Sequence, residues 1–228
     1  MTKLKEALEE QQRYYDDRAP EYDDWWFRRG MFDEGPAANA RWFAEAGVVS
    51  DALQALDLDG DVLELAAGTG IWSGLLVPRA RTLTLVDGSA QMLAHNPAAR
   101  DGKVRTVIAD LFQWRPDRSF DVVVFAFWIS HVPSELLADF LADVAAWLNP
   151  GGSVFFVDNL GKPEETAPHV LGKDGQFTRR RLADGRQATV VKNYYSRTDL
   201  QAKCLAAGLT VEVLETPTLF QYGIGRKT

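Results

Sequence analysis

The stretch Asp61-Val-Leu-Glu-Leu-Ala-Ala-Gly-Thr-Gly-Ile-Trp-Ser73 decides the fold of this chain. It begins with a short apolar run, Val62 to Leu65, that is interrupted only by Glu64. Small residues follow at positions 66, 68 and 70, and then an apolar stretch that can open a helix. This order predicts a buried parallel strand that runs through a tight turn into a helix N-terminus. Small residues there let backbone N–H groups approach a ligand, and the carboxylate of Glu64 suits a ligand with cationic groups.

The spacing of the small residues separates this turn from a dinucleotide-binding turn. A Gly-x-Gly-x-x-Gly fingerprint would need glycines at 66, 68 and 71, where the chain has Ala66, Gly68 and Ile71. The pattern is instead Glu-x-Ala-x-Gly-x-Gly, which begins at Glu64 and ends at Gly70. It resembles the first motif of class I S-adenosylmethionine (SAM)-dependent methyltransferases, with Ala66 in place of the first glycine. An NAD-dependent oxidoreductase is a disfavoured alternative.

Composition limits the remaining classes. The chain has 228 residues, of which 46% are hydrophobic, which fits one domain with a full core. A net charge of −7 argues against a nucleic-acid partner. Cys204 is the single cysteine and the three histidines lack ligand spacing, so no metal site is predicted. The N-terminus is charged and no apolar run reaches the roughly 18 residues of a membrane span, so a cytoplasmic protein without membrane association is expected.

Strand and helix signals alternate after the first motif. Further strands are expected at 82–86, 104–108, 122–127 and 153–157, with Ser134 capping the helix before the last of them. Five strands alternating with helices predict an α/β, doubly wound, Rossmann-like sheet. After a helix at 197–207, a strand pair at 210–214 and 219–224 closes the chain. The methyltransferase resemblance implies seven mostly parallel strands, the last of them antiparallel.

Two segments stand outside this alternation. Residues 1–59 are expected to form an N-terminal helical lid, with helices at 3–15 and at 37–56, the latter broken or bent near Gly47, and with exposed tryptophans at 25 and 26. Residues 60–228 form the core of the same single domain. Within it, an insertion at about 160–196 reads as a loop to 175 and then a β-hairpin across 183–186. The insertion is the expected source of acceptor specificity.

The resemblance also implies a SAM site at the carboxyl ends of the strands. Asp87 and Asp110 lie at the ends of the second and third strands, and Glu64 lies next to the last residue of the first strand. The carboxylate of Asp87 can accept both ribose hydroxyls, and Asp110 resembles the acid that accepts from the adenine amino group. The residues implied to bind SAM are Tyr15, Tyr22, Glu64, Ala66, Gly68, Thr69, Gly70, Asp87, Gly88, Ser89, Met92, Asp110, Leu111, Phe112 and Phe127.

The acceptor is expected beside the segment Ala126-Phe-Trp-Ile-Ser-His-Val-Pro133, whose aromatic residues suit a small molecule. His131 is the candidate base, because imidazole titrates near neutrality; simple packing beside the next helix is the alternative. The basic residues of the hairpin either discourage strand pairing or grip a carboxylate or phosphate on the acceptor. The candidate acceptor-binding residues are Trp26, Trp128, His131, Arg180, Tyr194 and Tyr195.

These patterns predict an enzyme that transfers a methyl group from SAM to an oxygen, nitrogen or carbon atom of a small aromatic or carboxylate-bearing metabolite. The demethylated product would be S-adenosylhomocysteine (SAH). A methyltransferase that acts on tRNA or protein, and a non-catalytic SAM-binding protein, are the alternatives. The aromatic residues near Trp25 and Trp26 leave open whether the protein forms a homodimer.

Overall fold

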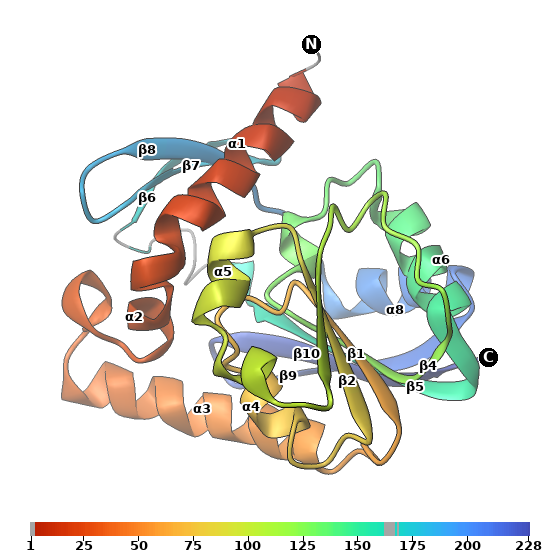
Figure 1. Ribbon diagram of the computed structural model, residues 1–228. Helices are drawn as coiled ribbons and strands as arrows, with labels where there is room; N and C mark the ends of the chain where they lie inside the picture. Colours follow the sequence, from red (N-terminus) through yellow and green to blue (C-terminus); the bar gives the residue numbers. More distant parts are fainter. Residues whose placement is uncertain (1–2, 162–166, 168) are drawn as a thin grey trace.

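The computed structural model describes residues 3–161, 167 and 169–228. Its main sheet has seven strands in the order β3-β2-β1-β4-β5-β10-β9 (Figure 1). The strands are β1 (Asp61–Leu65), β2 (Thr82–Asp87), β3 (Val104–Ile108), β4 (Phe120–Ala126), β5 (Leu148–Asn159), β9 (Leu209–Glu215) and β10 (Phe220–Lys227). Strands β1 to β5 pair in parallel, and β10 pairs antiparallel with β5 and β9. The predicted doubly wound sheet with an antiparallel last strand is confirmed.

Helices cover both faces of this sheet, because its central strands are apolar on both sides. Along β4, Val122 and Val124 belong to one buried cluster and Val123 and Phe125 to the other. The first cluster packs under α3 (Pro36–Gln54), α4 (Ser73–Leu76) and α5 (Ala90–His95), and the second under α6 (Leu137–Trp147) and α8 (Arg197–Ala206). The alternation of side chains along the strand therefore divides the core into two layers.

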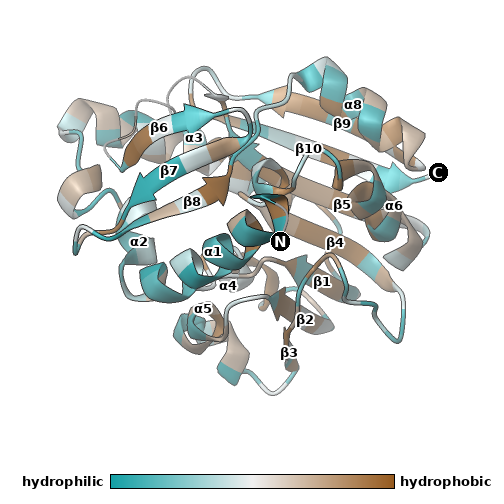
Figure 2. Cartoon of the chain, turned by 90° about the horizontal axis from the view of Figure 1, so that it is seen from above, coloured by the Kyte–Doolittle hydropathy of each residue, from teal (hydrophilic) through white to brown (hydrophobic). Residues whose placement is uncertain are grey.

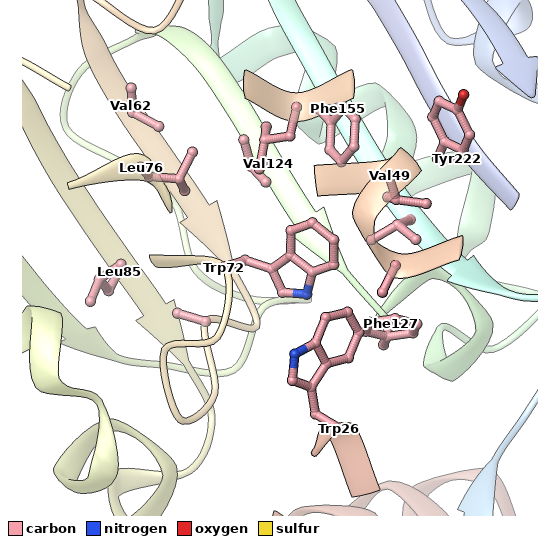
Figure 3. Close-up of a cluster of buried hydrophobic side chains, with 14 of the residues drawn as sticks. Trp26, Val49, Val62, Trp72, Leu76, Leu85, Val124, Phe127, Phe155 and Tyr222 are labelled. Atoms are coloured by element: carbon pink, nitrogen blue, oxygen red, sulfur yellow. The ribbon is translucent and has the colours of Figure 1, made fainter. Parts of the chain in front are cut away.

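The N-terminal segment packs tightly against the core. After α1 (Lys3–Arg18), η1 (Ala19–Glu21), α2 (Tyr22–Trp26) and η2 (Gly30–Phe32) lead into α3. Trp25 and Trp26 are 6% and 9% exposed, so the expectation that they are exposed is wrong. Figure 3 shows Trp26 beside Trp72 and Phe127 in the first cluster. The predicted break in α3 is also wrong, since the helix continues through Gly47, a residue that costs a helix interior only about 1 kcal/mol.

A second, three-stranded antiparallel sheet lies above the main one (Figures 1 and 2). It consists of β6 (Val170–Asp174), β7 (Phe177–Arg181) and β8 (Gln187–Val191). The predicted hairpin is confirmed as β7 and β8. The loop predicted up to residue 175 is wrong over β6, which pairs with β7. Residues 162–166 and 168 of that predicted loop lie outside the described residues.

Helix α1 joins the two sheets. It contacts β8 on one side and α5 on the other, so it crosses over the carboxyl ends of the main strands (Figures 1 and 2). Its buried residues, Ala7, Gln11, Tyr14 and Arg18, recur at helical spacing and form one face.

One predicted helix cap is wrong. The N-cap of α6 is Leu136, without a side-chain cap. Ser134 bonds instead to Gln176, at the turn before β7, because its backbone N–H donates to Oε1 of Gln176 at 3.0 Å. Ser134 therefore fixes the second sheet to the main one rather than beginning α6.

Candidate active site

A cavity of about 420 Å³ lies at the carboxyl ends of β1, β2 and β4, beneath α1. This volume is in the range of small-ligand and cofactor sites. The sequence-predicted residues that line it are Tyr15, Tyr22, Ala66, Gly68, Asp87, Gly88, Ser89, Met92, Asp110, Leu111, Phe112, Phe127, Trp128 and His131. Residues of α1 that the sequence analysis missed, such as Gln11 and Gln12, complete the wall.

The Gly-rich turn after β1 has an unusual backbone. Ala66, Gly68 and Gly70 have φ angles of 51°, 56° and 95°. A Cβ atom on Gly70 would lie 2.3 Å from Oδ1 of Asn96, so this position has no room for a side chain. Ala66 holds a left-handed conformation that is costly for a residue other than glycine. The turn is thus fixed in a shape that brings its backbone to the cavity.

Asp87 braces this turn. Its Oδ2 accepts a hydrogen bond from the backbone N–H of Gly68 at 2.8 Å, and its Oδ1 accepts from that of Ser89 at 2.8 Å. Burial raises the pKa of Asp87 to about 6, against the lowering effect of both N–H donors. A carboxylate offers about four acceptor positions, so two remain for a ligand in the cavity.

Glu64, Thr69 and Gly70 lie behind the cavity wall rather than on it. Oε2 of Glu64 accepts from the hydroxyl of Ser73 at 2.6 Å, and burial raises the pKa of Glu64 to about 8. The hydroxyl of Thr69 donates to Asp23 of α2 at 2.6 Å. These residues hold the turn from behind and tie it to the N-terminal segment.

Asp110 lies at the outer rim of the cavity, after β3. Its Oδ1 accepts from the backbone N–H of Phe112 at 2.9 Å, and its Oδ2 accepts from Nε2 of Gln113 at 2.9 Å. Leu111 is buried beside it. Asp87 and Asp110 therefore stand on one cavity, as the strand-end positions predicted.

His131 and Tyr15 meet at the inner end of the cavity. Nδ1 of His131 lies 2.6 Å from the carbonyl oxygen of Val191, and Nε2 lies 2.9 Å from the hydroxyl of Tyr15. Because a carbonyl only accepts, Nδ1 carries the hydrogen, and Nε2 is the ring nitrogen that can accept from Tyr15 when the ring is neutral. Burial raises the pKa of Tyr15 well above its ordinary value.

A smaller inner cavity adjoins this point. It shares Tyr15, Tyr22, Phe127 and His131 with the main cavity. Its further lining residues are Arg18, Trp25, Asn159, His169, Arg180 and Lys192. Arg180 is 2% exposed, so the interpretation that the hairpin arginines form a solvated edge is wrong for Arg180, although Arg179 and Arg181 are exposed.

Three candidate acceptor-binding residues line neither cavity. Trp26 packs in the core. The ring of Tyr194 lies 4.5 Å from Nζ of Lys173, and Tyr195 packs against the cluster under α6 and α8. The sequence analysis missed Arg18, which the helical spacing of the buried face of α1 could have indicated.

In residues 3–161, 167 and 169–228, no three His, Cys, Asp or Glu side chains converge as metal ligands. Among the helices of these residues, none is both long and apolar enough to cross a bilayer.

Comparison with known proteins identifies the family. The profile of a methyltransferase domain matches residues 38–214, more than half of the chain, so the chain belongs to this family. The protein is an enzyme with the class I methyltransferase fold, as residues 61–73 predicted. A search of curated proteins finds no match.

Solved structures agree with this assignment. A complex of DhpI with SAH is 34% identical, with a TM-score of 0.78 and 98% of each chain covered. A complex of DhpI with SAM and HEP is 35% identical, with a TM-score of 0.80, covering 99% of this chain and 100% of the other. The Burkholderia thailandensis 1,6-didemethyltoxoflavin-N1-methyltransferase is 16% identical, with a TM-score of 0.64 over 100% of this chain and 92% of that one, and shares the fold.

Proposed function

We propose that this protein transfers a methyl group from SAM to a small-molecule acceptor and releases SAH. The observation that carries the proposal is the position of Asp87. Its carboxylate accepts hydrogen bonds from the backbone N–H groups of Gly68 and Ser89, lines the cavity, and has acceptor positions left for a ligand. The relatives at 34% and 35% identity were solved with SAH and with SAM and HEP.

The residues around the cavity fit SAM in kind and position. Asp87 would accept from the ribose hydroxyls, and Asp110, Leu111 and Phe112 would hold the adenine at the outer rim. The small residues of the turn would admit the rest of the molecule close to the backbone. The other cofactor-binding residues proposed from the sequence remain Tyr15, Tyr22, Ala66, Gly68, Gly88, Ser89, Met92 and Phe127 on the cavity, whereas Glu64, Thr69 and Gly70 would act from behind its wall by supporting the turn.

When bound, SAM supplies a methyl carbon already activated by its sulfonium sulfur. The chain then has to align the acceptor, exclude water and take a proton where the acceptor carries one. Tyr15 lines both cavities, and its hydroxyl is bonded to His131. An acceptor proton can pass to the oxygen of Tyr15 while the phenolic proton passes to Nε2 of His131.

Residues 1–59 serve as the lid in this proposal, over a core of residues 60–228. Nε2 of Gln12 donates to the carbonyl of Gly88 at 3.0 Å, and the hydroxyl of Ser89 donates to Asp16 at 2.5 Å. Both bonds must open if α1 moves to admit a ligand. A cytoplasmic location and a homodimer complete the proposal. The single cysteine, Cys204, is buried and free, which suits a reducing compartment.

Calorimetric titration with SAM and SAH tests the proposal. Wild type should bind both with micromolar affinity, and Asp87→Ala should weaken binding at least tenfold, because the hydrogen bonds to a charged group are lost. Asp117→Ala, at an exposed acid beyond the other end of the strands, is the matched control. Unchanged SAH affinity in Asp87→Ala would remove the assigned site.

The acceptor is then sought by incubating the protein with labelled SAM and a panel of metabolites, tRNA and protein. Methylation of a small molecule supports the proposal. Methylation of tRNA or protein would replace the acceptor class. SAM binding without any turnover would favour a non-catalytic SAM-binding protein.

A further inference from the structure

A buried carboxylate, that of Asp158 near the end of β5, lies behind the turn that carries His131. Asp158 is 1% exposed and lines neither of the two cavities. Its Oδ2 accepts from the backbone N–H of Ser130 at 2.9 Å, and its Oδ1 accepts from the hydroxyl of Ser130 at 2.9 Å. Ser130 is the middle residue of η4 (Ile129–His131). The carboxylate therefore fixes the short helix from which the side chain of His131 extends.

The same carboxylate also fixes the hydrogen-bond partner of the His131 ring. Nζ of Lys192 lies 3.3 Å from Oδ1 of Asp158 and donates to the hydroxyl of Ser130 at 2.8 Å. Lys192 directly follows Val191, whose carbonyl oxygen lies 2.6 Å from Nδ1 of His131. Both ends of the bond between His131 and Val191 are thus tied to Asp158, one end through Ser130 and the other through Lys192.

The pair of Lys192 and Asp158 is a buried ion pair, because each residue is only 1% exposed. Such a pair contributes little net stability compared with apolar side chains of the same size, since both charges lose their water. It does select one arrangement of β8 against η4, because another arrangement would leave a buried charge without its partner. The backbone N–H of Asn193 donates to the carbonyl of Ser130 at 2.7 Å and holds the same register.

The orientation of the His131 ring decides which of its nitrogen atoms is available. With Nδ1 bonded to the carbonyl of Val191, Nε2 faces the hydroxyl of Tyr15 at 2.9 Å. Which nitrogen of a histidine carries the proton is set by the hydrogen bond of the other nitrogen. Without the carbonyl of Val191 in place, the ring would no longer be held with Nε2 as the acceptor for Tyr15.

On the basis of the proposed function, we infer that Asp158 is a positioning residue of the active site. Its carboxylate keeps the ring of His131 in the orientation and the tautomer that leave Nε2 for Tyr15. In a Ser-His-Asp triad, the carboxylate bonds directly to Nδ1 of the histidine and has this orienting role. Here the carbonyl of Val191 occupies that place, and Asp158 acts one contact further back.

Nuclear magnetic resonance of the His131 ring tests this role in the full-length protein, both free and saturated with SAH. The histidines are labelled with nitrogen-15, and His131→Gln identifies the resonances of His131. At about pH 8, where an imidazole is ordinarily neutral, wild type should show one tautomer with the hydrogen on Nδ1. That hydrogen should exchange slowly with solvent, because it is buried and bonded to a carbonyl.

Two variants remove the support in different ways. Asp158→Asn removes the charge, and Ser130→Ala removes the hydroxyl but keeps the ion pair between Lys192 and Asp158. Ser130→Ala therefore remains informative if Asp158→Asn does not fold. We expect each variant to raise the exchange rate of the Nδ1 hydrogen by about tenfold or more and to show a mixture of both tautomers.

Glu45→Gln is the matched control. Glu45 is also a buried carboxylate, and it accepts from the backbone N–H groups of Thr218 and Leu219 at 3.1 and 2.9 Å. It lines neither of the two cavities. Glu45→Gln should lower the midpoint of thermal unfolding and leave the tautomer and the exchange rate of His131 as in wild type.

The outcomes separate this inference from the proposed function. If the His131 resonances of Asp158→Asn and Ser130→Ala match those of wild type, Asp158 only supports the fold and the inference is overturned. Equal changes in Glu45→Gln, or a loss of SAH binding in both Asp158→Asn and Ser130→Ala, would show general loosening and overturn it as well. If wild type itself does not bind SAH, the proposed function fails, whatever the state of the ring.

Discussion

The hydroxyl of Tyr15 lies 2.9 Å from Nε2 of His131, and the two rings meet edge to face at 87°. The residues are far apart in the sequence, and one belongs to the helix that covers the cavity while the other follows β4. Because Nδ1 of His131 is held by the carbonyl of Val191, only Nε2 can exchange a proton with Tyr15. The pair is thus complete only when α1 is in place.

Removal of the phenolic hydroxyl should therefore slow methyl transfer to an acceptor that carries a proton. We expect Tyr15→Phe and His131→Ala each to lower kcat about 100-fold, in the range of general acid–base catalysis, with SAH affinity within threefold of wild type. Tyr14→Phe, one position earlier and outside both cavities, is the control and should keep full activity. Full activity in Tyr15→Phe would show that the pair only supports the structure.

The affinity for SAH should depend on pH through Asp87. Its pKa is raised to about 6, and the ionised carboxylate is the better acceptor for ribose hydroxyls. The dissociation constant should therefore fall about tenfold per pH unit below pH 6 and level off above about pH 7. Calorimetry from pH 5 to 8 measures this, with Asp87→Asn as the variant that binds weakly at every pH. An equally steep profile in Asp87→Asn would assign the titration to another group.

Glu64 should make the free energy of unfolding fall as pH rises. Its pKa is about 8 in the folded protein, above the ordinary value of about 4.3, so only the folded state keeps the proton between these values. The stabilisation is complete below about pH 4.3 and is lost as pH approaches 8. Glu64→Gln can keep the bond to Ser73 without titrating. Urea unfolding at pH 5 and at pH 8 measures this. From the lower to the higher pH, the free energy of unfolding of Glu64→Gln should rise by a few kcal/mol relative to that of wild type, on the order of 1.4 kcal/mol per pH unit. If the free energies of unfolding of wild type and Glu64→Gln changed with pH in parallel, the raised pKa of Glu64 would be contradicted.

A methyl group at position 70 should damage both fold and site. Gly70→Ala places a side chain at a φ of 95° and against Asn96, which should cost about 1–3 kcal/mol and weaken SAH binding. Gly74→Ala, in α4 with nothing near the added atom, is the control and should be neutral or stabilise the protein by up to about 1 kcal/mol. Thermal unfolding and SAH titration of both variants make the comparison. Equal stability of the two variants would mean that the side chain of Asn96 can move away from the added methyl group without loss of folding free energy.

The sheet could be predicted because its signals are local. The central strands β1, β4 and β5 carry apolar runs and β2 and β9 carry an alternation of apolar and polar residues, and the small residues at 66, 68 and 70 mark the turn whatever surrounds them. The acids at 87 and 110 could be placed on one cavity because parallel strands present their carboxyl ends at one edge.

The features that were missed depend on contacts between distant segments. Strand β6 is short and rich in polar residues, and its state is decided by pairing with β7. The local sequence around Ser134 is typical of a helix cap, but the backbone N–H of Ser134 donates to the distant Gln176 instead. Arg18 looks like a surface residue of a charged helix, and only the packing of Tyr14, Tyr22 and Phe32 around it makes it a buried cation.

Helix α1 carries residues of both cavities on one rigid element: Gln12 and Asp16 bond to the rim of the main cavity, and Arg18 points into the inner one. A ligand that fixes the helix in place at one cavity lowers the conformational entropy that is lost when a second ligand binds at the other cavity. The two binding equilibria are then thermodynamically coupled, and each ligand must raise the affinity of the other by the same factor. Cooperative binding at the two cavities is therefore expected if α1 moves when a ligand enters.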